Sequence, residues 1–182
     1  MCTLSVWKKR IALVAALAFM LHGSSVFALD AAEDRRGPFW GMGLGGNGDV
    51  SIPGADVGGG FTFDIQVGAG ATKHLTLALD IDVTGVFLDG QQNIIFCPGP
   101  ELNYFFGDTG IFIRFGLAAA VSLVWVGAEN DVQGGFQAGA GFGWEFFANT
   151  NLAVGTALEF DYMLRSGNDL MMFGFMFDMK YY

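Results

Sequence analysis

Cysteine is scarce in this sequence of 182 residues, and that limits how the chain can be stabilised. The two cysteines are Cys2 and Cys97, and Cys2 lies in a segment that we expect to be removed after export. One remaining cysteine excludes a disulfide within the mature chain. No cysteine lies at the expected cleavage site either, which argues against a lipoprotein.

A long apolar run is missing too, although 52% of the residues are hydrophobic. A membrane helix needs about 20 consecutive apolar residues. The best candidate beyond the N-terminus, residues 115–128, is shorter than that. A chain that is this apolar but has no such run is expected to form strands in which apolar and polar residues alternate.

Basic residues are few, and three of the nine lie close to the N-terminus. Lys8, Lys9 and Arg10 precede an apolar run at 11–21, and a boundary of small residues ends at Ala28. This order predicts a signal peptide over 1–28 rather than a membrane helix, because the apolar run has about half the necessary length.

Without the signal peptide, six basic residues remain against eighteen acidic ones, for a net charge of −12. Nucleic acids require a basic surface, so a nucleic-acid partner is not expected. We expect a short periplasmic segment at 29–37 and a barrel in the outer membrane at 38–182.

Apolar and polar residues alternate in eight segments, most clearly in 75–84. There Leu, Ile and Val hold the odd positions, while Thr, Ala and Asp hold the even ones. A tilted membrane strand needs about ten such residues. The segments are 39–45, 61–67, 75–84, 96–106, 111–122, 136–146, 152–162 and 171–182.

The connections between these segments predict two different ends. Short turns are expected at 72–74, 108–109 and 149–151, and longer loops at 46–59, 88–93, 124–134 and 165–170. Short periplasmic turns opposite longer outer loops are typical of an outer-membrane barrel. Pro98 and Pro100 disturb this pattern, so we expect that strand to begin nearer Gly99 or Glu101, or to contain a bulge.

Alternation alone also fits a soluble sandwich or barrel, and three features favour the membrane. Glycines crowd the polar face, where a narrow interior needs small residues. All strand charges share that face. Aromatic residues collect near the strand ends, as expected where rings meet lipid headgroups. This predicted aromatic girdle includes Trp40, Tyr104, Phe146, Phe160, Tyr162 and Tyr181.

With its signal peptide, its eight amphipathic segments, the hairpin motifs "GFGWEF" and "NLAVGTALEFDY", and its aromatic C-terminal strand, the chain resembles the small outer-membrane barrels of Gram-negative bacteria. These are the OmpA-like and opacity-protein-like proteins, and the resemblance covers residues 38–182. It implies an all-β, eight-stranded, antiparallel, up-and-down transmembrane barrel. It also implies contact with outer-membrane lipid and lipopolysaccharide, and with the barrel-assembly machinery through the C-terminal strand, where Tyr181 has the lipid-facing parity.

The polar face predicts a charged interior. We expect a lumen charge network near the short turns, and an acidic vestibule nearer the longer loops that only Arg165 could reach. The network comprises Glu101, Arg114, Glu145, Asp178 and Lys180; the vestibule comprises Asp64, Asp80, Asp82, Glu159 and Asp161.

The predicted turn places Asp64 opposite Asp82, where both carboxylates cannot ionise cheaply. Two explanations stay open. Water, protonation or a shift of register could relieve the repulsion, with no metal bound. Alternatively, the pair holds a weak divalent cation, since oxygen ligands suit Ca²⁺ or Mg²⁺.

No enzyme is expected, because the histidine base that a serine hydrolase needs is not in place. His74 is the only histidine after the signal peptide, and it lies in a predicted turn away from the serines. We also expect no cofactor. The expected role is therefore structural or porin-like with a narrow, cation-favouring lumen, and the alternative is a surface-interaction protein acting through its outer loops.

Overall fold

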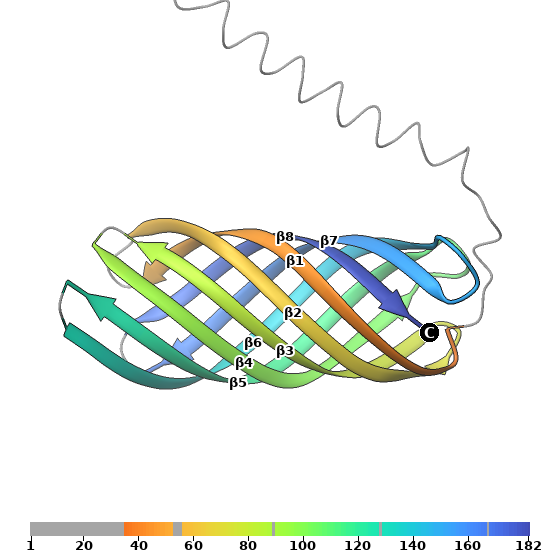
Figure 1. The fold of residues 1–182 in the computed structure, drawn as a ribbon, viewed down its shortest axis with the longest axis horizontal. Helices are drawn as coiled ribbons and strands as arrows, with labels where there is room; N and C mark the ends of the chain where they lie inside the picture. The colour runs from red at the N-terminus through yellow and green to blue at the C-terminus, as the bar shows by residue number, and fades with distance from the viewer. Residues whose placement is uncertain (1–34, 53–55, 89, 128, 167) are drawn as a thin grey trace, which may run out of the picture. The chain divides into compact units, whose positions relative to one another are not determined.

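The computed structural model describes residues 35–52, 56–88, 90–127, 129–166 and 168–182, and the predicted signal peptide lies outside them. Eight strands pair antiparallel in chain order, and β1 also pairs with β8, which closes a barrel (Figure 1). The prediction of an all-β, eight-stranded antiparallel barrel is confirmed. The strands are β1 Gly37–Ile52, β2 Val57–Thr72, β3 Leu75–Leu88, β4 Gln91–Phe105, β5 Ile111–Val126, β6 Glu129–Phe147, β7 Leu152–Arg165 and β8 Asp169–Tyr181.

No helix formed by the described residues is long and apolar enough to cross a membrane.

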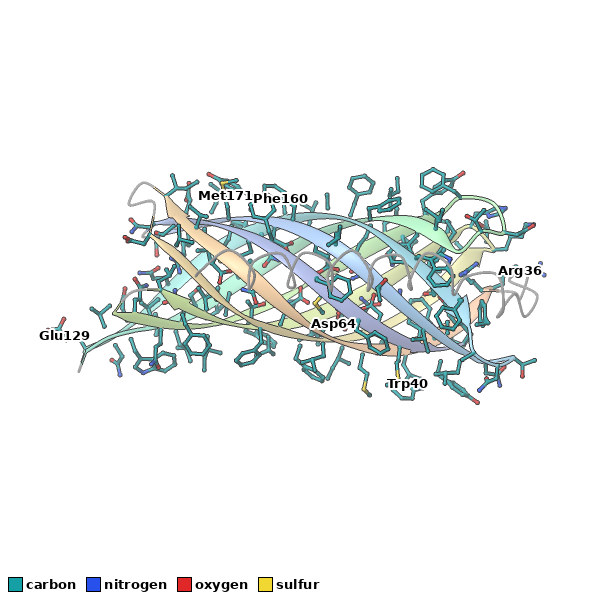
Figure 2. The ribbon with its side chains drawn as sticks, turned by 90° about the horizontal axis from the view of Figure 1, so that it is seen from above. Arg36, Trp40, Asp64, Glu129, Phe160 and Met171 are labelled. Carbon is teal, nitrogen blue, oxygen red and sulfur yellow. The ribbon has the colours of Figure 1, made fainter. Side chains whose placement is uncertain are left out.

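The large apolar side chains lie on the outside of the barrel. In β3, Leu77 and Leu79 are 50% and 55% exposed, while the alternating residues Thr76 and Ala78 are buried. Trp40 and Phe160 likewise point away from the barrel (Figure 2). An apolar exterior of this extent is unsuited to water and suited to hydrocarbon.

The two ends of the barrel carry different residues. The terminal end carries Arg36 (Figure 2) and the C-terminal residue, Tyr182 (Figure 1), and the far end carries Glu129 (Figure 2). Arg36 and Glu129 lie at opposite ends of the barrel in that view.

The connections at the far end are shorter than the sequence predicted. Only two to four residues separate consecutive strands there, at 53–56, 89–90, 127–128 and 166–168. Most residues of the predicted long loops are instead part of strands, and the strands are 13 to 19 residues long. Gly, Asn and Asp disfavour strands locally, but continued pairing with a neighbouring strand overrides that preference.

The prolines of β4 interrupt one ladder without ending the strand. β4 begins at Gln91, so the expected start near Gly99 is wrong, and Pro98 and Pro100 both pair with β3. Pairing with β5 stops after Phe96 and resumes at Glu101 in the same register, so there is no bulge. Proline has no N–H to donate, and both prolines withhold it from the same neighbour.

Apolar side chains fill two parts of the interior. The far-end cluster comprises Val86, Leu88, Ile95, Cys97, Ala120, Met163, Leu170 and Met172. The terminal-end cluster comprises Phe105, Phe112, Ala157 and Met176. The interior therefore contains apolar side chains at two levels as well as charged ones.

Candidate functional site in the barrel interior

Arg114 is the centre of the interior charge network. Its side chain is 6% exposed and meets carboxylates from three other strands. Nη2 lies 2.7 Å from Asp178 Oδ2, Nε lies 3.3 Å from Glu101 Oε2, and Nη1 pairs with Glu159. Nε also donates a hydrogen bond to Asn103 Oδ1 at 3.1 Å. These contacts tie β4, β5, β7 and β8 together across the lumen.

Glu145 organises a second charged group at the terminal end. Its Oε1 accepts a hydrogen bond from Arg35 Nε at 2.8 Å and lies 3.2 Å from the Tyr182 hydroxyl. Lys180 Nζ lies 3.5 Å from Oε2. The predicted network is thus divided: Glu101, Arg114 and Asp178 belong to the first group, and Glu145 and Lys180 to the second.

Arg35 closes the terminal end together with the last residue of the chain. Its guanidinium carbon lies 3.9 Å from the centre of the Phe105 ring. The Tyr182 ring packs against Phe39 and Phe147, with centroids 5.2 and 5.4 Å apart. Tyr182 follows the last strand. Burial raises the pKa of its hydroxyl well above the usual range, and the nearby Glu145 carboxylate raises that pKa further. The hydroxyl therefore stays protonated and able to donate.

Asp64 and Asp82 lie directly opposite each other in the ladder between β2 and β3, as the sequence predicted. Asp80, two residues along β3, joins them. One ligand oxygen from each of the three carboxylates lies within 4.8 Å of the others. We call these three residues the aspartate cluster.

The remaining members of the predicted acidic vestibule have other partners. Glu159, expected to lack a cation, pairs with Arg114 because strand tilt brings these two residues to the same level. Asp161 accepts a hydrogen bond from Gln137 Nε2 at 2.9 Å. Arg165, expected to reach this group, instead donates from Nε to the backbone oxygen of Asn168.

The acidic residues do not form an open mouth. The far-end apolar cluster occupies the interior beyond them, because the inward positions of β3 change from Asp82 and Thr84 to Val86 and Leu88. A cavity of about 50 Å³ remains beside the charges. Its polar lining includes Asp80, Asp82, Glu101, Arg114, Glu159 and Asp161.

The predicted girdle residues lie at the barrel surface. Trp40, Tyr104, Phe160 and Tyr181 are exposed, and Phe146 and Tyr162 are half-buried. Rings stack near the terminal end in the pairs Trp40–Tyr181 and Trp144–Phe146, while Phe160 contacts Phe173 on the neighbouring strand.

Sequence reasoning missed Arg35 and the two apolar clusters. Arg35 precedes the first strand, so no strand alternation marked it. The residues of the clusters point inward. Several of them lie beyond the predicted strand ends, so the alternation was not applied to them. Extending the alternation of 75–84 by four residues would have placed Val86 and Leu88 inside.

No family model matches the chain, and no curated protein matches it in sequence. Its structure is similar to that of neisserial surface protein A, with 13% identity and a TM-score of 0.67 over 79% of this chain and 96% of that one. It is also similar to Ail, the attachment invasion locus protein of Yersinia pestis, with 8% identity and a TM-score of 0.54 over 80% and 99%. At such identities the similarity establishes the fold, and the chain is a small eight-stranded transmembrane β-barrel of the outer-membrane type.

Proposed function

We propose that the protein is a structural barrel of the outer membrane whose lumen carries no continuous channel. The observation that supports this is the Arg114 network, which bridges the interior between two apolar clusters. An eight-stranded barrel has an interior just wide enough for side chains to fill. The porin-like alternative would need these side chains to move aside.

The proposal includes the export of the protein, its orientation in the outer membrane and its partners there. The signal peptide directs export, and the terminal end faces the periplasm. Membrane lipid and lipopolysaccharide surround the apolar exterior, and the barrel-assembly machinery contacts the C-terminal strand. The exposed, alternating aromatic residues of β8 support these partners: Phe173, Phe175 and Phe177 are each about half exposed.

No catalytic activity is part of the proposal. His74 lies in the connection between β2 and β3 at the terminal end. Ser51, Ser122 and Ser166 lie in or next to the far-end halves of β1, β5 and β7. A serine and a histidine base must lie within hydrogen-bond reach to cooperate, and these residues are at opposite ends.

Planar-bilayer recording of the purified, refolded protein tests the closed lumen. We expect no single-channel steps, whereas a general porin in the same bilayers serves as the positive control. A cation-selective current in the wild type, reduced in Asp64→Asn or Glu159→Gln, would contradict the proposal and support a porin-like role.

A second candidate is surface interaction, favoured by the end of the β5–β6 hairpin. Val132 is 66% exposed, and the exposed acidic residues Glu129 and Asp131 are close to it in the sequence. The far-end connections are short, so strand ends would supply the contact surface. Expressing cells should then lose adhesion to a host surface when Glu129 and Asp131 are replaced by lysine; unchanged adhesion argues against this role.

A further inference from the structure

We propose that the aspartate cluster binds one divalent cation, Ca²⁺ or Mg²⁺, inside the barrel. This inference goes beyond the structural role, and it holds whether or not the lumen conducts. The ligands are one carboxylate oxygen each from Asp64, Asp80 and Asp82.

The geometry comes from the pairing of β2 with β3. Asp64 and Asp82 are direct partners in the ladder, and Asp80 faces the lumen two residues before Asp82. Their oxygens lie within 4.8 Å of one another, a separation that oxygens sharing an ion at 2.3–2.6 Å can have. Both cations prefer oxygen ligands, and Ca²⁺ accepts them in irregular arrangements.

The salt bridges of the interior leave this cluster without a directly paired cation. Arg114 pairs with Glu101, Glu159 and Asp178, and Asp161 accepts a hydrogen bond from Gln137. Among the salt bridges of the described residues, none involves the three members of the aspartate cluster. Carboxylates taken out of water need a cation or a proton.

A neighbouring amide points independently to a ligand. Gln66 is 1% exposed and lies opposite Asp80 in the ladder. Its Nε2 donates to Glu101 Oε2 on β4 at 3.4 Å, so the amide reaches across β3 beside Asp80. Its Oε1 has no hydrogen-bond partner, and neither has Asp80 Oδ1. Buried acceptors usually have a donor or a cation as partner, and a cation held by the aspartate cluster would provide one for Asp80 Oδ1.

There is room for the ion. The cavity of about 50 Å³ borders Asp80 and Asp82, and a water molecule occupies about 30 Å³ in the liquid. Asp64 and Gln66 do not line this cavity, so it offers room beside Asp80 and Asp82 for a water bound to the ion. Water and protein oxygens together would complete the coordination.

Binding to the purified, refolded full barrel tests the proposal directly. The protein is kept in a zwitterionic detergent free of lipopolysaccharide, treated with a chelator, and dialysed against radioactive Ca²⁺. We expect about one Ca²⁺ per barrel. At saturating CaCl₂ the unfolding midpoint should rise by roughly 5 °C or more relative to NaCl of equal ionic strength.

Two variants locate the site, and a third is the matched control. Asp80→Asn and Asp82→Asn should each weaken Ca²⁺ binding at least tenfold. Asp131→Asn removes an exposed carboxylate at the far end and should bind as the wild type does. Asp82 is only half-buried, so its variant carries the test if Asp80→Asn does not fold.

Absence of stoichiometric binding to the wild type at millimolar Ca²⁺ and Mg²⁺ overturns the proposal and leaves protonation as the explanation. Equal binding by wild type and Asp82→Asn overturns it as well. Bilayer conductance is measured separately, so an open channel would refute the proposed function without bearing on the cation site.

Discussion

At the scale of single residues, the stability of the interior charge network depends mainly on Arg114. It is almost fully buried among three carboxylates, and removing it would leave them without their cation. Breaking a buried ion pair from one side typically costs about 3–5 kcal/mol. We expect Arg114→Leu to lower the free energy of unfolding by that amount, measured by urea titration in detergent.

Lys73 provides the control for this prediction. It pairs with Asp108 at 3.2 Å, but the two side chains are 57% and 59% exposed. Exposed pairs contribute about 0–1 kcal/mol. Lys73→Leu should therefore change stability little, and an effect equal to that of Arg114→Leu would show that burial does not govern these pairs.

Two glycines on neighbouring strands test packing at the same scale. A Cβ on Gly60 of β2 would collide with the backbone of Gly85, whereas one on Gly48 of β1 would meet nothing within 4 Å. Gly60→Ala should cost about 1–3 kcal/mol through overpacking. Gly48→Ala should stay within about 0.5 kcal/mol. Paired urea titrations compare them, and equal costs would exclude a steric cause.

At the scale of elements, the interrupted ladder between β4 and β5 predicts a local weakness. Leu117 and Ala119 lie opposite Pro100 and Pro98, where pairing is absent, whereas Ile113 and Phe115 pair with β4. All four share the same side of β5. Hydrogen exchange measured by NMR should be faster at Leu117 and Ala119. Equal protection at the four amides would mean that the ladder continues past the prolines.

The strands are also where prediction from the sequence worked best. Alternation placed all eight, because side-chain parity is a property of each strand by itself, and the predicted turn at 72–74 put Asp64 opposite Asp82. The strand ends were harder to predict, since Gly, Asn and Asp in 46–59 indicate a loop unless a neighbouring strand is known to pair with them.

At the scale of the whole molecule, closure and tilt create contacts that no single strand reveals. Arg114 and Glu159 are 45 residues apart on strands that do not pair with each other, yet they meet across the lumen. Arg35 and Tyr182 meet Glu145 because β1 begins and β8 ends at the same end of the barrel. Register between distant strands depends on the shear of the closed barrel, which the sequence does not display.

The central claim is that the Leu- and Phe-bearing sides of the strands face hydrocarbon and the polar sides enclose the lumen. Spin labels at neighbouring positions in lipid vesicles, with Cys97→Ser as background, test it most directly. Labels at Leu79 and Leu117 should collide with membrane-dissolved oxygen, while labels at Ala78 and Ala118 should be protected from it. Oxygen accessibility at Ala78 and Ala118, with Leu79 and Leu117 reached by a water-soluble nickel chelate, would contradict the account.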